Sequence, residues 1–189
     1  MASSQLRIII DGGYLFKVFD PYRKAGYRQS FKRLGRLLAV NYNLRGIHYV
    51  NSINNRDQAT REKQEKFYQG HLRDQLGWNV HILPLQWPGG RAEQKGTDST
   101  ITLLLHDLAV KNKYETAILL AADSDFCPPV ELAKSQGKII RNAYFSARPS
   151  FHLQQACNGE LIRLDDLDFV YKDGDPRALI RLADLKEKI

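Results

Sequence analysis

Short apolar runs alternate with longer, partly polar stretches along the whole chain. The runs at residues 6–10 and 116–122 are almost wholly apolar, which is typical of strands buried on both faces of a parallel sheet. Weaker runs of the same kind lie between and after them. The pattern predicts six strands, at residues 6–10, 47–50, 80–83, 114–122, 138–144 and 161–164.

The stretches between these strands carry apolar residues at helical spacing, and several begin at a residue that can cap a helix. Ser30 and Ser150 are such caps, and Gly77 and Gly137 follow predicted helix ends. Pro21 is expected to interrupt the first helix, with a connection at residues 22–28, because proline lacks a backbone N–H. The predicted helices cover residues 14–20, 31–40, 58–76, 98–109, 130–136, 150–157 and 176–188.

Strands and helices alternate throughout, which predicts an α/β fold with a parallel sheet of five to six strands and helices on both faces. The first and fourth strands both lead into aspartates, which can form one site only if those two strands are neighbours. The expected strand order is therefore 3-2-1-4-5. The length of 189 residues suits one such domain. We therefore expect a single domain over residues 1–189, with a core at about 6–170 and a C-terminal helix at 176–188.

Acidic residues directly follow two of the predicted strands. Asp11 ends the first strand, and Asp123 and Asp125 follow the fourth. Ligands bind outside the carboxyl ends of the strands in such sheets, so we expect these acids to meet there. Asp98, in the first turn of the helix before the fourth strand, is expected on the same rim. The alternative is that Asp123 or Ser124 only caps the following helix.

Carboxylates that lie close together repel one another, and a bound cation relieves that repulsion. Oxygen ligands without histidine or cysteine suit Mg²⁺ or Mn²⁺ rather than zinc. Beside a basic surface, such a site supports metal-assisted cleavage of phosphodiester bonds. The turn at Gly12 and Gly13 is not a P-loop or a dinucleotide motif, because the later glycines and the Gly-Lys-Ser/Thr sequence do not follow.

Composition favours a globular protein with a polyanionic partner. The formal net charge is +7, from 28 Lys and Arg against 21 Asp and Glu, which favours binding to phosphates. No run approaches the ~18 apolar residues of a membrane span, and none resembles a secretory signal, so no membrane association is expected. Cys127 and Cys157 indicate reduced thiols of a cytoplasmic protein rather than a disulfide or a zinc site.

Three motifs, in their order and spacing, resemble one known family. They are Ile10-Asp11-Gly12, Lys95-Gly96-Thr97-Asp98 and Ala122-Asp123-Ser124-Asp125-Phe126, with Pro129 and Gly137-Lys138 after them. Together they resemble the NYN domain, a Rossmannoid, PIN-like nuclease fold, and most of all its LabA/DUF88-like subgroup. The segment from Ser150 to Ile162 is similar to the closing part of that family, so the resemblance covers about residues 6–170.

The resemblance implies a ribonuclease site that depends on Mg²⁺ or Mn²⁺. Its acidic positions match Asp11, Asp98, Asp123 and Asp125, of which the first three are the expected metal ligands. The expected substrate-binding residues are Lys95, Tyr14, Ser124 and Arg91. Lys95 is either a phosphate contact or a solvated loop lysine. Arg91 and Trp87 are candidates for stacking on an RNA base, unless Trp87 packs against the domain.

The chain departs from the family pattern at three places. Tyr14 stands where many members have Asn, Leu104 where many carry a further acid, and Ala121-Ala122 where Ser-Gly is commoner. The expected function is an endoribonuclease that acts on single-stranded or structured RNA. The alternative is a catalytically weak or inactive RNA-binding adaptor. A phosphotransfer receiver is disfavoured, because no receiver pattern of Lys and Thr follows the sheet, and a homo-oligomer is left open.

Overall fold

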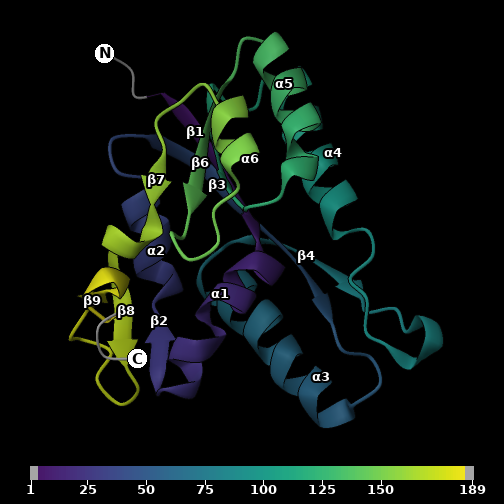
Figure 1. The fold of residues 1–189 in the computed structure, drawn as a ribbon, viewed down its shortest axis with the longest axis vertical. Helices are drawn as coiled ribbons and strands as arrows, with labels where there is room; N and C mark the ends of the chain where they lie inside the picture. Colours follow the sequence, from purple (N-terminus) through teal and green to yellow (C-terminus); the bar gives the residue numbers. More distant parts are fainter. Residues whose placement is uncertain (1–3, 186–189) are drawn as a thin grey trace.

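The predicted strands form one parallel sheet in the computed structural model, which describes residues 4–185 (Figure 1). Strand β1 (Gln5–Asp11) lies between β3 (Asn43–Ile53) and β5 (Thr116–Leu120). The other strands are β4 (Asn79–Pro84), β6 (Ile139–Tyr144) and β7 (Ile162–Arg163). The order across the sheet is β4-β3-β1-β5-β6-β7.

The five strands of the predicted order correspond to β4, β3, β1, β5 and β6 and follow one another as expected. The observed arrangement differs from the predicted order in two details. The short strand β7 adds a sixth strand beside β6, and an unpredicted strand, β2 (Tyr27–Gln29), belongs to a separate sheet. Chain connections change direction between β1 and β5, so this is the switch point at which α/β sheets bind ligands.

Helices cover both faces of the sheet, as predicted. One face carries α1 (Gly12–Lys24), α2 (Phe31–Leu38) and α3 (Gln58–Glu65), which continues as a π-helix over Lys66–Gln75. The other face carries α4 (Thr97–Val110), α5 (Cys127–Ser135) and α6 (Phe151–Ala156). Figure 1 shows α4, α5 and α6 together on one side and α1 and α2 on the other.

The central strand explains why its sequence is apolar without interruption. Ile8 and Ile10 are fully buried in the core beneath α1 and α2, whereas Ile9 is buried in the core beneath α4 and α5. Each such side chain contributes about 1.5–3 kcal/mol when removed from water. A strand with helices on both faces has no solvent side, so the alternation of polar and apolar residues disappears.

A second, three-stranded antiparallel sheet packs against the helices α1 and α2 and was not predicted. It joins β2, β8 (Asp168–Lys172) and β9 (Ile180–Arg181) in the order β2-β8-β9. Phe169 and Val170 of β8 are fully buried in the core on that face. An ion pair from Arg28 to Asp173 at 2.6 Å links β2 to the end of β8 within this sheet. A second ion pair, from Arg33 of α2 to Asp168 at 2.7 Å, joins the sheet to the rest of the domain.

The predicted C-terminal helix at residues 176–188 is wrong over the part that the structure describes. The chain there forms β9 and a short 3-10 helix, Leu182–Leu185, and residues 186–189 lie outside the described range. The local preference for helix yields to tertiary packing, because Leu182 and Leu185 are buried in the core beneath the second sheet.

The predicted interruption at Pro21 is also wrong. Helix α1 continues through Pro21 to Lys24, and β2 begins within the expected connection at residues 22–28. The last turn is held by ion pairs from Asp20 to Arg23 and Lys24, each at 2.6 Å, and by stacking of Phe19 on Tyr22. These contacts offset the hydrogen bond that the proline removes.

Candidate active site

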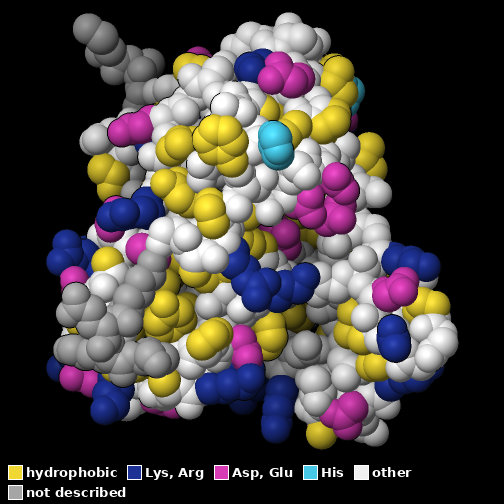
Figure 2. All heavy atoms as spheres, in the orientation of Figure 1, with side chains coloured by type: hydrophobic (Ala, Val, Ile, Leu, Met, Phe, Trp, Pro, Cys, Tyr) yellow, Lys and Arg dark blue, Asp and Glu magenta, His cyan; other side chains and the backbone are white. Residues whose placement is uncertain are grey.

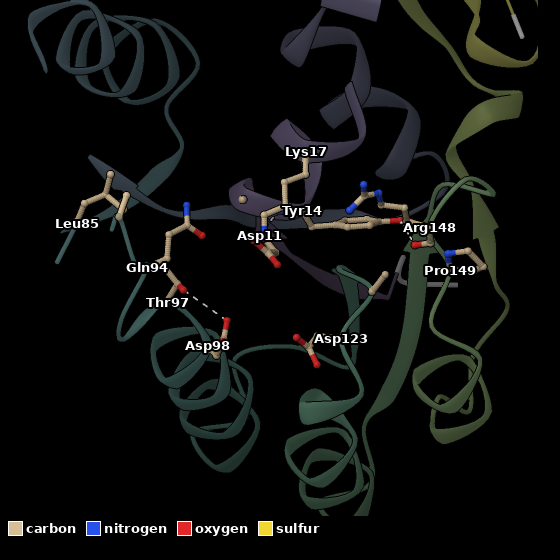
Figure 3. Close-up of a pocket in the computed structure, with 13 residues that line it drawn as sticks. Asp11, Tyr14, Lys17, Leu85, Gln94, Thr97, Asp98, Asp123, Arg148 and Pro149 are labelled. Carbon is tan, nitrogen blue, oxygen red and sulfur yellow. Dashed lines mark hydrogen bonds between the residues drawn. The ribbon is translucent and has the colours of Figure 1, made fainter. Parts of the chain in front are cut away.

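A pocket of about 630 Å³ opens at the carboxyl edge of the sheet, over the switch point between β1 and β5. Asp11, Asp98 and Asp123, the three expected metal ligands, all line it. Figure 3 shows them on three separate elements around one open space. The structure therefore brings together residues that are up to 112 positions apart in the sequence.

Asp11 occupies the last position of β1 and the N-cap position of α1. Its Oδ1 accepts a hydrogen bond from the backbone N–H of Tyr14 at 3.0 Å. Burial raises the pKa of the Asp11 carboxyl, and the nearby charge of Asp98 raises it further, against the opposing effects of backbone N–H groups and Lys17. Asp11 therefore both begins the helix and presents a carboxylate to the pocket.

The turn after Asp11 brings α1 unusually close to β3. A Cβ added to Gly12 would lie 2.5 Å from Cζ of Tyr49 and 2.8 Å from Nδ2 of Asn51. Any larger residue would push the start of α1, and with it Asp11, away from the sheet. Glycine is therefore required here by close approach.

Asp98 is the second residue of α4, whose N-cap residue is Gly96 with a φ of 86°. This left-handed conformation, which glycine adopts most readily, turns the chain from the preceding loop into the helix. Oγ1 of Thr97 donates to Oδ1 of Asp98 at 3.4 Å. Burial raises the pKa of the Asp98 carboxyl, and the charges of Asp123 and Asp125 raise it further.

Asp123 follows β5 and caps the 3-10 helix Ser124–Phe126, with Oδ1 accepting from the N–H of Asp125 at 3.0 Å. The predicted alternative, a capping role for Asp123, is therefore real, but the residue lines the pocket as well. The buried Asn142 of β6 fixes this strand end, since its Nδ2 donates to the carbonyls of Leu119 and Ala121 at 3.0 and 2.9 Å.

The donor set suits a hard divalent cation, because the three carboxylates supply oxygen and the pocket lining includes no histidine or cysteine. Within residues 4–185, however, no three His, Cys, Asp or Glu side chains converge closely enough to hold a metal ion directly. Mg²⁺ usually keeps several waters and takes only one or two carboxylates directly. The arrangement therefore fits an ion that is held partly through water.

Four of the other predicted site residues lie around the pocket rather than in it. Asp125 and Ser124 are exposed on the 3-10 helix, and neither lines the pocket. Arg91 and Lys95 are exposed on the loop before α4, where Nζ of Lys95 lies 3.5 Å from Oε2 of Glu93. Their roles in substrate binding stay predictions.

The predicted packing alternative for Trp87 describes its surroundings well. Its Nε1 donates to Oδ1 of Asn55 at 2.9 Å, and the guanidinium of Arg56 lies 4.5 Å from the centre of its ring. The indole therefore stabilises the loop between β4 and α4 while remaining partly exposed.

The sequence matches the NYN domain family over residues 6–165, which is most of the chain. The chain belongs to the NYN domain family. NYN domains are part of the PIN-like nuclease superfamily, which supports a nuclease role in general for this protein. The match is to the NYN domain as a whole, so the LabA/DUF88-like subgroup stays a prediction.

Comparison with solved structures shows that this NYN domain shares its fold with a protein of unknown function from Vibrio parahaemolyticus. The two are 21% identical with a TM-score of 0.69, and the match covers 89% of this chain and 97% of the other. A second match is to MurG from Acinetobacter baumannii, at 9% identity over 85% of this chain and 45% of that one. Its TM-score of 0.40 is too low to indicate a shared fold. No curated protein matched the sequence.

Two basic residues that sequence reasoning missed also line the pocket of this NYN domain, Lys17 and Arg148. Lys17 lies one helical turn after Gly13, on the same face of α1 as Tyr14, and that spacing was a usable signal. Arg148 follows β6, the neighbour of β5, so its loop leaves the same edge of the sheet.

Tyr14 lines the pocket, but its hydroxyl group is already engaged. It accepts from the backbone N–H of Phe145 at 2.8 Å and donates to the carbonyl oxygen of Arg148 at 2.9 Å. Burial raises the pKa of Tyr14 to about 12, so the phenol stays protonated at physiological pH. In this NYN domain the tyrosine joins α1 to the loop after β6.

In the described part of the chain, no helix combines the length and apolar character that crossing a bilayer requires.

Proposed function

We propose that this protein is a metal-dependent ribonuclease that cleaves RNA at the pocket over the switch point. The observation that carries the proposal is the meeting of Asp11, Asp98 and Asp123, from three elements, in one pocket of a domain whose superfamily consists of nucleases. An endonucleolytic mode fits a pocket that is open to solvent on one face of the molecule (Figure 2).

Asp11, Asp98 and Asp123 are the residues that would hold Mg²⁺ or Mn²⁺. A bound ion of this kind activates water as the nucleophile and stabilises the charge that develops on phosphorus. The raised pKa values of Asp11 and Asp98 reflect burial and the mutual repulsion of the carboxylates, and a cation between them would relieve that repulsion.

RNA is the proposed substrate because NYN nucleases act on RNA and because the chain is basic, with a formal net charge of +7. Figure 2 shows Lys and Arg side chains on one side of a central hollow and acidic side chains on the other. A polyanion that approaches this face is attracted to one wall and requires a cation at the other.

The second candidate is an RNA-binding adaptor that keeps the fold but cleaves slowly or not at all. It is favoured by the open arrangement of the three carboxylates, which do not converge on one point in the described chain. Leu104, at a position where a further acid would extend the site, instead packs against the apolar core beneath α4.

Cleavage of a labelled RNA pool by the wild-type protein with Mg²⁺, with Mn²⁺ and with EDTA separates these two candidates. A nuclease gives cleavage with either metal and none with EDTA, because removing a water-activating ion costs orders of magnitude in rate. RNA binding without cleavage under any metal would favour the adaptor. Cleavage that persists in EDTA would contradict a metal-dependent site.

Calorimetric titration with Mn²⁺ tests the ligand set independently of activity. Asp123→Asn is expected to weaken Mn²⁺ binding strongly. Asp107→Asn is the matched control, because Asp107 pairs with Lys111 at 2.8 Å near the far end of α4 and should leave binding unchanged. Equal binding by Asp123→Asn and the wild type would remove Asp123 from the site.

A further inference from the structure

The side chains of the two basic residues in the pocket are not paired with any group in the part of the chain that the structure describes. Neither the ammonium of Lys17 nor the guanidinium of Arg148 forms a hydrogen bond or an ion pair with any residue in 4–185, although both belong to the pocket lining. By contrast, Arg23, Lys24 and Arg28 are all paired with acids at 2.6 Å. An anionic ligand in the pocket would supply the partner that these two positive charges lack within the described residues.

These cations lie on the wall opposite to the acids of α4 and the β5 end. Figure 3 shows Lys17 and Arg148 on one side of the open space, and Asp98 and Asp123 on the other. Lys17 is close enough to Asp11 and Asp98 for its charge to oppose the rise in their pKa values. A phosphodiester strand in the pocket would therefore meet positive charge on one side and carboxylates on the other.

The loop that carries Arg148 is held at two points by buried groups. The hydroxyl of Tyr14 bonds both to the N–H of Phe145 and to the carbonyl of Arg148. On the other side, the carboxylate of Asp165, which is 1% exposed, accepts from the N–H of Ser146 at 2.8 Å and from its hydroxyl at 3.0 Å. An exposed arginine is thus presented from a rigid support.

We propose that Lys17 and Arg148 form a subsite for a backbone phosphate of single-stranded RNA, and that Tyr14 positions Arg148 within it. The proposal rests on the proposed function for the identity of the strand. Arg offers a planar, two-pronged donor that matches phosphate oxygens, and Lys offers a point charge. Together they bind the strand on the wall away from the carboxylates and so set which side of it faces Asp98 and Asp123.

The test is binding of a labelled single-stranded RNA, measured by fluorescence anisotropy in EDTA so that neither metal nor cleavage contributes. Lys17→Ala and Arg148→Ala are each expected to weaken binding about 10-fold, the usual cost of losing a hydrogen bond to a charged group. Each should also make the log–log dependence on salt shallower by roughly 0.7, the value for one lost phosphate contact on a single strand.

Matched controls remove the same charges elsewhere. Lys113, exposed in the turn before β5, and Arg36, exposed in the last turn of α2, both lie toward the amino edge of the sheet. Neither lines the pocket or forms an ion pair with a described residue. Lys113→Ala and Arg36→Ala should leave both the affinity and the salt dependence close to wild type.

A double-mutant cycle tests the positioning role of Tyr14. Tyr14→Phe keeps the ring but removes the hydroxyl that orients the loop, so it should weaken RNA binding in the wild-type background. It should cost nothing further when combined with Arg148→Ala, because the residue that it positions is then gone. Equal losses in both backgrounds would show that Tyr14 acts independently of Arg148 and would overturn its positioning role.

Other outcomes overturn the subsite itself. These are unchanged binding by both pocket variants, equal weakening by the pocket and control variants, or no RNA binding by the wild type. The first outcome leaves the nuclease proposal standing if the wild type cleaves RNA with a metal. Conversely, selective loss of binding in the pocket variants supports the subsite even if no metal brings about cleavage.

Discussion

At the scale of single residues, the candidate site depends on side chains that serve the fold and the chemistry at once. Asp11 caps α1 and lines the pocket, and Asp123 does the same for the helix after β5. Capping alone would be served equally well by asparagine, which cannot bind a divalent cation as a carboxylate does. The carboxylate of Asp11 is, however, unfavourable to bury, and its raised pKa reflects this.

That cost predicts how Asp11→Asn changes stability. A carboxyl whose pKa is raised on folding destabilises the native state above that pKa and has no such effect below its ordinary value of 3.8. Asp11→Asn should therefore melt at a higher temperature than wild type near pH 7, with the gain vanishing as the pH falls toward 3.8. Metal-free thermal unfolding followed across this pH range measures it.

Asp11→Ala is the companion variant. It also removes the charge but loses the cap, so it should be less stable than Asp11→Asn by about 1 kcal/mol. If Asp11→Asn were less stable than the wild type at neutral pH, the carboxylate would be stabilising the fold, contrary to this account.

At the scale of elements, the main sheet was predictable and the second sheet was not. Strands covered on both faces produce unbroken apolar runs such as residues 6–10. The aspartates that follow β1 and β5 indicated that these two strands are neighbours. The strands β2, β8 and β9 have only two to five residues, too few for a period to emerge. Their position depends on packing between distant segments, which local sequence does not encode.

The candidate site shows the same division. Acids at strand ends were visible in the sequence, because the carboxyl edge of a parallel sheet gathers them. Lys17 was marked only by its helical spacing from Gly13 and Tyr14, and Arg148 was not marked at all, because its relevance depends on which loop reaches the pocket. The role of Tyr14 depends on two hydrogen bonds to a loop more than 130 residues away, and no local pattern predicts these.

The close packing of α1 on β3 gives a prediction for this pair of elements. Gly12→Ala would place a methyl group against the buried ring of Tyr49, so it should destabilise the protein by roughly 1–3 kcal/mol. Gly70→Ala, in the π-helix with no atom within 4 Å of the added Cβ, is the matched control and should be neutral or stabilising. Denaturant unfolding of both variants measures the difference, and equal stabilities would contradict the close approach.

At the scale of the whole molecule, acidic and basic side chains line different walls of one pocket. In the function proposed above, the carboxylates of β1, α4 and the β5 end would hold a cation, and the basic side chains of α1 and the β6–α6 loop would hold a polyanion. Phosphate contacts position a nucleic acid, whereas the metal supplies the chemistry. Affinity and cleavage should therefore respond to different substitutions.

The most direct measurement compares the wild type with Asp11→Asn in two assays, RNA cleavage with Mn²⁺ and RNA binding in EDTA. We predict that Asp11→Asn abolishes cleavage while it binds RNA as tightly as the wild type or more tightly, because a negative charge near the phosphates has been removed. Cleavage by Asp11→Asn at the wild-type rate would contradict the assignment of the carboxylate pocket as the active site.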